Sequence, residues 1–249
     1  MNYVAAGAGP TILFVPGWCM PGWIFDRQVE ALAARLRVVV MDPRGQGRSE
    51  VARTGYDPAR RGRDVAEMIA TIGAPRVVLA GWSLGVLDAL SCVNATGDGR
   101  IAGLVLIDNS IGEGAPPPAG SGQFFRNLRT QRDRTVRGFC ASMFVRSPGP
   151  DYLDRLAREA QRMPVEDSIK LLSYPRPREF WRDTIYATQR PVLYAVRPRW
   201  REQGELLVQK HPGAEMEVYD NAGHALFVDE AERFNASLQR FVLTKARFA

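Results

Sequence analysis

The chain of 249 residues is poor in cysteine and has no long hydrophobic run. Its apolar stretches, such as Thr11–Val15, have the length of a strand, whereas a membrane helix needs about 20 apolar residues. Residues 1–10 contain neither the basic segment nor the long apolar segment of a secretory signal. The three cysteines, Cys19, Cys92 and Cys140, are too few and too scattered for a disulfide framework or a zinc site. We therefore expect a cytoplasmic protein with no membrane span and no bound metal.

The formal net charge of +6 is concentrated in one internal third of the chain. Residues 112–190 carry fourteen basic residues against nine acidic ones, and the rest of the chain carries 19 against 18. A nucleic-acid-binding protein presents a dedicated basic face, so we expect no nucleic-acid partner. We interpret the local excess as a sign of an anionic substrate or an acidic partner.

Apolar, β-branched runs alternate with stretches of helical spacing. We expect strands at 11–15, 37–42, 76–81, 103–108, 191–196 and 215–220. We expect helices at 27–36, 59–72, 84–95, 201–210 and 230–243. This alternation predicts a mostly parallel sheet with helices on both faces. Active sites in such sheets lie at the carboxyl ends of the strands.

One long segment interrupts the alternation. It opens with a glycine- and proline-rich tract at 112–122 and then becomes helical and rich in arginine. Such a length is uncommon for a loop without structure in a compact domain. We expect residues 111–190 to form a helical cap, inserted into a core made of residues 1–110 and 191–249.

Residues 81–85, Gly-Trp-Ser-Leu-Gly, follow a predicted strand and lead into a predicted helix. A G-x-S-x-G pattern in that context is typical of a sharp turn that presents a nucleophilic serine, here Ser83. The alternative is a chance match in a loop. We call residues 81–85 the elbow.

A nucleophilic serine needs a base, and the chain has two histidines. His224 follows the last predicted strand, at the sheet edge where Ser83 is expected, and is the predicted base. His211 ends a predicted helix and is expected at the surface.

The oxyanion formed by attack of Ser83 needs two backbone N–H donors. Leu84 supplies one at the start of a helix, where the dipole also favours negative charge. Trp18 is the second candidate, in the loop Pro16-Gly17-Trp18-Cys19 that follows the first predicted strand. We call residues 16–20 the oxyanion loop. Gly17 would let this backbone come close, although Pro16-Gly17 could also be only a turn.

The sequence resembles the α/β-hydrolase superfamily through residues 16–18, 42–49, 81–85 and 223–224. The resemblance implies an α/β-hydrolase fold and a serine hydrolase that uses no metal and no organic cofactor. It implies structural roles for Asp42 and Arg44, which lie in the turn at 42–49. Two departures are a Pro-Gly in place of the family's His-Gly in the oxyanion loop and a truncated leading hairpin.

The family commonly places an acid after the strand at 191–196, but the loop there reads Arg-Pro-Arg-Trp-Arg. Some members carry the acid at the end of the preceding strand, where this chain has Asp108. We expect Asp108 to orient His224. Glu202, Asp220 or the absence of any acid remain alternatives.

Trp18, Trp23 and Trp82 flank the oxyanion loop and the elbow, which predicts an aromatic, apolar substrate pocket. Two of them could equally be core residues. The Gly-Trp pairs resemble those of small carboxylesterases of the biotin pathway, which cleave a methyl ester from a carrier-bound acyl chain. That resemblance implies a contact between cap arginines and an acyl carrier protein or CoA; the alternative is a solvated helix face. The candidate arginines are Arg126, Arg129, Arg132, Arg134 and Arg137.

Together these features predict hydrolysis of a carboxylic ester, thioester or lactone. Acyl transfer or hydrolysis of a carbon–carbon bond is compatible with the same residues. A ligand-binding protein with weak catalysis is a third possibility. The acyl chain length, the pathway and the oligomeric state stay open.

Overall fold

The computed structural model describes residues 1–114, 122–173 and 175–248, and its strands form one seven-stranded sheet in the order β1-β3-β2-β4-β5-β6-β7. The strands are β1 (Asn2–Ala6), β2 (Thr11–Val15), β3 (Arg37–Asp42), β4 (Val77–Trp82), β5 (Ile101–Ile107), β6 (Val192–Val196) and β7 (Ala214–Val218). β1 runs antiparallel to β3, and the other neighbouring pairs are parallel. The mostly parallel sheet predicted from the sequence is confirmed.

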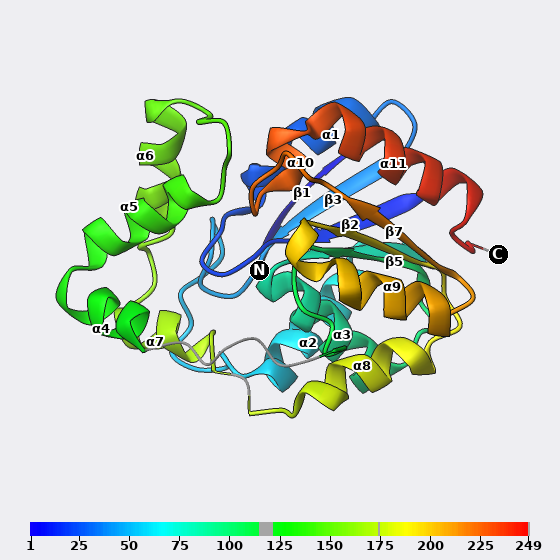
Figure 1. The fold of residues 1–249 in the computed structure, drawn as a ribbon, viewed down its shortest axis with the longest axis horizontal. Helices are drawn as coiled ribbons and strands as arrows, with labels where there is room; N and C mark the ends of the chain where they lie inside the picture. The colour runs from blue at the N-terminus through cyan, green and yellow to red at the C-terminus, as the bar shows by residue number, and fades with distance from the viewer. Residues whose placement is uncertain (115–121, 174, 249) are drawn as a thin grey trace.

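Helices cover both faces of this sheet. They are η1 (Gly22–Phe25), α1 (Asp26–Leu32), α2 (Pro58–Thr71), α3 (Leu84–Thr96), α4 (Gln123–Thr130), α5 (Arg132–Ser142), α6 (Pro150–Glu159), α7 (Val165–Lys170), α8 (Arg178–Ala187), η2 (Pro198–Trp200), α9 (Arg201–Lys210), α10 (Leu226–Asp229) and α11 (Ala231–Thr244). Figure 1 shows α1 and α11 on one face and α2 and α3 on the other. Every residue of β2, β4 and β5 is buried, which explains their almost continuous apolar sequence.

The sequence pattern missed β1 and overextended α1. Tyr3 and Val4 are exposed on this edge strand, so β1 lacks the apolar alternation of a half-buried strand and is defined by its pairing with β3. Within the given sequence, β1 is the strand that precedes β2. α1 ends at Leu32, and a turn follows in which the N–H groups of Arg35 and Leu36 donate to the Leu32 carbonyl at 3.0 and 2.9 Å.

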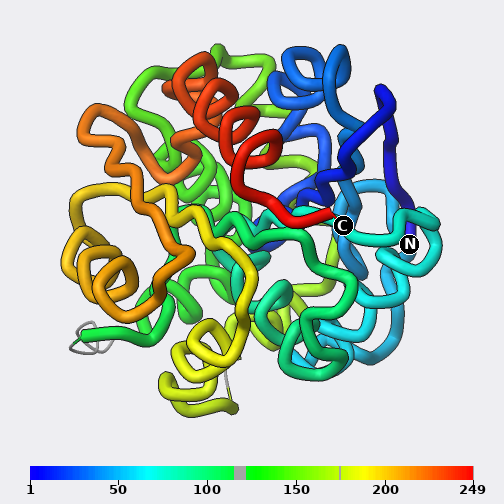
Figure 2. The backbone as a smooth tube through the Cα atoms, turned by 90° about the vertical axis from the view of Figure 1, so that its right-hand side faces the viewer, coloured from blue at the N-terminus to red at the C-terminus, as the bar shows by residue number. Residues whose placement is uncertain are grey.

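The segment between β5 and β6 carries α4 to α8. Figure 1 shows α4, α5 and α6 standing to one side of the sheet, whereas α8 packs against α3. Most of the predicted glycine- and proline-rich tract, residues 115–121, lies outside the described residues. In Figure 2 the C-terminal helix α11 lies on the outside of the molecule, and beyond it the N–H of Arg247 donates to the Ala102 carbonyl at 2.8 Å.

Candidate active site

The elbow is the sharp turn that joins β4 to α3. Ser83 has φ 54° and ψ −120°, a conformation that costs a non-glycine residue about 1–3 kcal/mol. Its N–H donates to the Ile107 carbonyl at 2.9 Å. A Cβ on Gly81 would lie 2.3 Å from the Gly85 carbonyl oxygen, and one on Gly85 would lie 2.1 Å from that of Val15. The strand–turn–helix context predicted for Ser83 is therefore present, and both glycines are sterically required.

His224 lies in the loop between β7 and α10, beside the elbow. Its Nδ1 lies 2.6 Å from Oδ2 of Asp108, and its ring centroid lies 5.1 Å from that of Trp82. The Trp82 indole N–H donates to the His224 carbonyl at 2.9 Å, which ties this loop to the residue next to Ser83. Among the described residues, Nε2 of His224 has no hydrogen-bond partner.

Asp108 directly follows β5 and is almost completely buried. It has φ 46°, and its N–H donates to the Ala195 carbonyl on β6 at 2.9 Å. Its carboxylate accepts the Arg197 backbone N–H at 3.0 Å through Oδ1 and the Arg197 side-chain Nε at 2.6 Å through Oδ2. Sequence reasoning missed Arg197, although an arginine in place of the expected acid was a signal.

The alternative acids lie elsewhere. Asp220 is exposed and pairs with Arg201 at 3.1 Å. Glu202 is the second residue of α9, and its carboxylate lies 3.7 Å from where a Cβ on Gly114 would be. Of the three carboxylates considered from the sequence, the structure brings Asp108 to His224.

The oxyanion loop runs against the elbow. A Cβ on Gly17 would lie 3.0 Å from Cβ of Ser83, so glycine permits this close approach. The backbone N–H of Trp18 has no acceptor in the described part of the chain. Leu84 is the first residue of α3, where backbone N–H groups have no acceptor within the helix. Both predicted donors are thus unpaired beside Ser83.

Gln46, in the turn at 42–49, braces the oxyanion loop. Its side-chain oxygen accepts the Cys19 N–H at 2.8 Å, and its amide nitrogen donates to the carbonyls of Gly17 and Met20 at 3.1 Å. Gln46 is buried, so these contacts are shielded from water. Sequence reasoning did not single out this residue, because a glutamine in a glycine-rich turn carries no distinctive signal.

Asp42 and Arg44 make structural contacts. The Asp42 carboxylate accepts the N–H groups of Gly22 and Arg48 at 2.7 and 2.9 Å. Arg44 forms a bidentate pair with Asp64 at 2.7 and 2.8 Å. Neither side chain contacts Ser83, Asp108 or His224.

The side chain of Trp18 joins the oxyanion loop to the inserted helices. Its indole N–H donates to the Ser168 carbonyl in α7 at 2.6 Å. Its ring meets Phe124 of α4 and Phe139 of α5 edge-on, with centroids 5.5 and 5.2 Å away. These three rings, which we call the aromatic cluster, form an apolar surface beside the predicted oxyanion donor.

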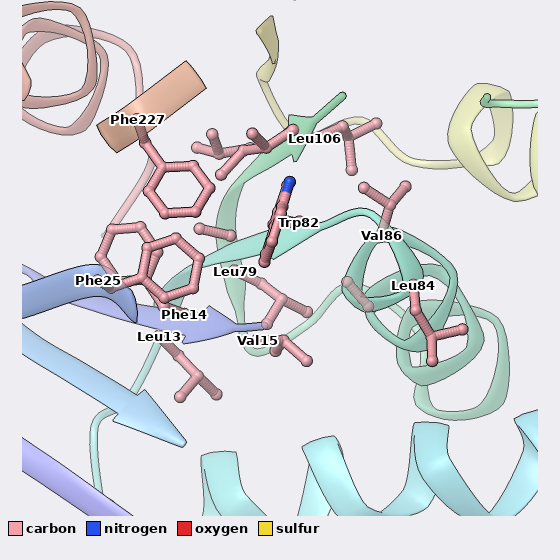
Figure 3. Packing of buried hydrophobic residues seen from close by; sticks show 14 of the residues in the cluster. Leu13, Phe14, Val15, Phe25, Leu79, Trp82, Leu84, Val86, Leu106 and Phe227 are labelled. Carbon is pink, nitrogen blue, oxygen red and sulfur yellow. The ribbon is translucent and has the colours of Figure 1, made fainter. Parts of the chain in front are cut away.

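The other two tryptophans have different surroundings. Trp82 is a core residue that packs against Phe25 and Phe227, as Figure 3 shows. Trp23 packs on Tyr152 of α6 and donates to Glu159 at 2.9 Å. It lines a cavity of about 210 Å³ whose lining includes no residue of the elbow.

His211 corrects one expectation. It is buried rather than at the surface. One ring nitrogen lies 3.1 Å from the Thr188 carbonyl oxygen, and the other accepts the Gly213 N–H at 3.2 Å. Its ring closes the turn between α9 and β7, which a sequence pattern could not reveal.

We call the five candidate arginines, Arg126, Arg129, Arg132, Arg134 and Arg137, the arginine stripe. Four of them form hydrogen bonds or ion pairs within the segment between β5 and β6. The contacts are Arg126 with Gln123, Arg129 with Glu166, Arg132 with the Met163 carbonyl, and Arg137 with Asp133 and Asp154. Arg134 has no hydrogen-bond or ion-pair partner among the described residues and borders an open hollow between α4 and α5. Two of these five arginines, Arg129 and Arg137, are therefore paired with carboxylates, whereas Arg126 and Arg132 donate to neutral oxygen atoms.

Asp229 connects the His224 loop to the inserted segment. Its carboxylate accepts the N–H of Gly223, directly before His224, at 2.7 Å. It also accepts the N–H groups of Val145 and Arg146, which follow α5, at 2.9 and 3.3 Å. One side chain thus fixes two loops that meet beside the site.

Within residues 1–114, 122–173 and 175–248, no group of three or more His, Cys, Asp or Glu side chains could hold a metal ion. None of the helices there combines the length and the apolar character that crossing a membrane requires.

Comparisons with known proteins show the family and the fold of the chain. The sequence model of the alpha/beta hydrolase family matches residues 12–237. The chain is 28% identical to the pimeloyl-[acyl-carrier protein] methyl ester esterase of Stenotrophomonas maltophilia (strain K279a), over 97% of this chain and 96% of that protein. It is 36% identical to a non-heme haloperoxidase of Rhodococcus erythropolis, over 95% and 93%. The solved esterase from Exiguobacterium antarcticum superposes with a TM-score of 0.86 at 21% identity, covering 97% of this chain and 95% of that one.

Proposed function

Because the chain belongs to the alpha/beta hydrolase family, we propose that it is a serine hydrolase that cleaves a carboxylic ester, thioester or lactone through an acyl-enzyme intermediate. The observation that carries this proposal is the 2.6 Å contact between Nδ1 of His224 and the buried Asp108 carboxylate, beside the strained Ser83. The printed names of the esterase relatives support ester hydrolysis.

In the proposed reaction, Oγ of Ser83 attacks the substrate carbonyl carbon while Nε2 of His224 accepts the hydroxyl proton. Asp108 holds the Nδ1–H and stabilises the imidazolium that forms. The tetrahedral intermediate then expels the alcohol, thiol or ring oxygen, which takes the proton from Nε2. Water repeats the sequence on the acyl-enzyme, releases the acid and restores Ser83.

The carbonyl oxygen becomes negatively charged in the intermediate. The backbone N–H groups of Trp18 and Leu84 are the proposed donors, because both are unpaired beside Ser83. The N-terminal end of α3 adds a favourable dipole. Removal of one such donor in other enzymes lowers turnover by about 10²- to 10³-fold.

We place the acyl chain of the substrate against the aromatic cluster of Trp18, Phe124 and Phe139. Apolar rings beside the oxyanion donors favour an aliphatic or aromatic acyl group over a charged one. A core of residues 1–110 and 191–249 with a cap at 111–190 fits this placement, since α4 and α5 supply two of the rings.

The substrate is a small acyl ester or thioester, free or attached to an acyl carrier protein or CoA. The name of the Stenotrophomonas relative supports the carrier-bound form. Within the predicted stripe, Arg134 is the cation best placed to meet an acidic carrier, because Arg129 and Arg137 already have carboxylate partners. Arg126 and Arg132 already donate to Gln123 and to the Met163 carbonyl.

A fluorophosphonate probe tests the proposed nucleophile. We expect one covalent adduct, at Ser83, which should be absent from Ser83→Ala. The control is Ser110→Ala, which replaces a serine that contacts Gln203 and should keep the adduct. Turnover of p-nitrophenyl butyrate should fall at least about 10⁴-fold in Ser83→Ala alone. The proposal would be contradicted if the wild-type protein neither reacts with the fluorophosphonate nor hydrolyses acyl esters. Adding alcohol or amine acceptors to the assay separates hydrolysis from acyl transfer.

A further inference from the structure

An arginine directly follows β6, and its side chain folds back onto the Asp108 carboxylate. Arg197 is the first residue after β6, and its backbone N–H and its side-chain Nε reach different oxygens of Asp108, at 3.0 and 2.6 Å. The Asp108 side chain is fully buried, whereas one quarter of the Arg197 side chain is exposed. One residue therefore holds both carboxylate oxygens.

We propose that Arg197 is a positioning residue that locks the Asp108 carboxylate in the orientation His224 requires. The proposal rests on the proposed serine-hydrolase function. Oδ2 of Asp108 lies 2.6 Å from both Nε of Arg197 and Nδ1 of His224. Because a carboxylate oxygen accepts along more than one lone-pair direction, the two donors share Oδ2 without displacing each other.

Rotation of the carboxylate is the motion that Arg197 opposes. The terminal torsion of an aspartate is broad and only weakly restricted by its own chain. The backbone N–H of Arg197 pins Oδ1, and the Nε pins Oδ2, so a rotation would break both bonds. Pinning the carboxylate in this way keeps Oδ2 aimed at His224.

Because the Asp108 carboxylate is buried, it needs a charged or hydrogen-bonding partner. A buried carboxylate without a charged or hydrogen-bonded partner is strongly destabilised. Arg197 is the arginine that the structure pairs with Asp108. Asp108 also has φ 46°, so its backbone needs neighbours that hold it.

Arg197 acts through Asp108 and not on the reacting atoms. Its Nη2 lies 3.5 Å from Nδ1 of His224, but the Nδ1–H is directed at the nearer Oδ2 of Asp108. The guanidinium therefore borders the pair without taking the place of the acid.

The same loop supplies a matched control. Arg199 lies two residues further on and stacks its guanidinium on the Trp200 ring at 4.6 Å. It has no contact with Asp108 or His224, so Arg199→Met removes an equal charge without touching the pair.

The test compares Arg197→Met, Arg197→Lys and Arg199→Met in steady-state assays with p-nitrophenyl butyrate. We expect Arg197→Met to lower kcat by about 10- to 100-fold with KM nearly unchanged, as misplacement of a catalytic group does. Arg197→Lys keeps the positive charge but loses the Nε donor, so its kcat should lie between that of the wild type and that of Arg197→Met. Arg199→Met should match the wild type. Wild-type kcat in Arg197→Met or in Arg197→Lys would overturn the proposal.

Chemical rescue separates positioning from a general loss of structure. Added guanidinium chloride should raise kcat of Arg197→Ala, because the free cation can refill the space beside Asp108. The same salt should not raise kcat of Asp108→Asn, which lacks the carboxylate. Equal rescue of both variants, or no rescue of Arg197→Ala, would refute the assignment.

A spectroscopic reading does not depend on turnover. The Nδ1 proton of His224, held by a carboxylate at 2.6 Å, should give a low-field proton resonance. We expect it to move or broaden in Arg197→Met and to stay in Arg199→Met; an unchanged resonance in both would overturn the proposal. If the wild type neither hydrolyses esters nor reacts with a fluorophosphonate, the proposed function fails, and this resonance still decides the role of Arg197.

Discussion

Replacing Asp229 tests whether one carboxylate holds the His224 loop in place. Asp229→Ala removes three hydrogen bonds, to the N–H groups of Gly223, Val145 and Arg146. These bonds are partly exposed to water, so each contributes about 0.5–1 kcal/mol, and the loss should total about 2 kcal/mol. Asp229→Asn should lose less, because an amide oxygen in the place of Oδ2 keeps the two shorter bonds at 2.7 and 2.9 Å.

Two measurements are needed, because stability and loop position are separate consequences. Urea unfolding gives the change in the free energy of unfolding, and steady-state hydrolysis gives kcat. We expect kcat of Asp229→Ala to fall about 10-fold or more, since Gly223 directly precedes His224 and a misplaced base slows proton transfer.

Asp220→Ala is the control for this prediction. Asp220 lies in the same loop, but it is exposed and its one ion pair within the described part of the chain is with Arg201, so its removal should change stability by less than about 0.5 kcal/mol. The reasoning is refuted if Asp229→Ala behaves like Asp220→Ala in both measurements.

Three further predictions concern the acid, the oxyanion loop and a buried carboxylate. Asp108→Asn should lower kcat by about 10³- to 10⁴-fold in ester hydrolysis, whereas Glu202→Gln should not change it; equal effects would refute the assignment. Gln46→Ala removes three contacts to the oxyanion loop and should lower kcat at least about 10-fold, with KM less affected in the same assay. Burial raises the pKa of Asp88 from 3.8 to about 6 against the opposing charge of Arg61. The folded state therefore binds the proton more tightly, and the contribution of Asp88 to the free energy of unfolding should fall by about 2 kcal/mol as the pH rises from 4 to 6. Urea unfolding over that range should show this slope in the wild type and not in Asp88→Asn.

The fold was predictable because both faces of the sheet are covered. Strands such as Leu-rich β5 have no polar side, and their short apolar runs are visible without any other information. The predicted strands at 11–15 and 37–42 coincide with β2 and β3. β1 was not predictable in the same way, because Tyr3 and Val4 are exposed and the strand is defined by pairing with residues 32 to 40 positions away in the sequence.

The residues of the candidate site were also predictable only where the sequence around them forms a local pattern. Ser83 and His224 stand in local patterns whose steric or positional reasons can be read from adjacent residues, such as Gly81 and Gly85 around the elbow. Gln46 acts on a loop that lies 26 to 29 residues away in the chain, so no local pattern announces it.

The three tryptophans show that a local sequence pattern does not determine the direction of a side chain. Three tryptophans close to catalytic motifs predicted one pocket, but Trp23 turns to α6, Trp82 enters the core and Trp18 turns toward α4 and α5. Sequence proximity places a Cα near a site, whereas the packing of distant helices decides where the ring goes.

The register of β5 and β6 explains how the acid and the arginine come together. Ile107 pairs with Ala195, so the residues that follow these parallel strands emerge side by side at the carboxyl edge of the sheet. An acid after either strand can therefore face the same histidine, and an acid after β5 leaves the position after β6 free for a cation. Asp108 and Arg197 form such a pair at 2.6 Å. The arginine that made the usual acid position look empty is, on this reasoning, the partner that a buried acid on the neighbouring strand requires.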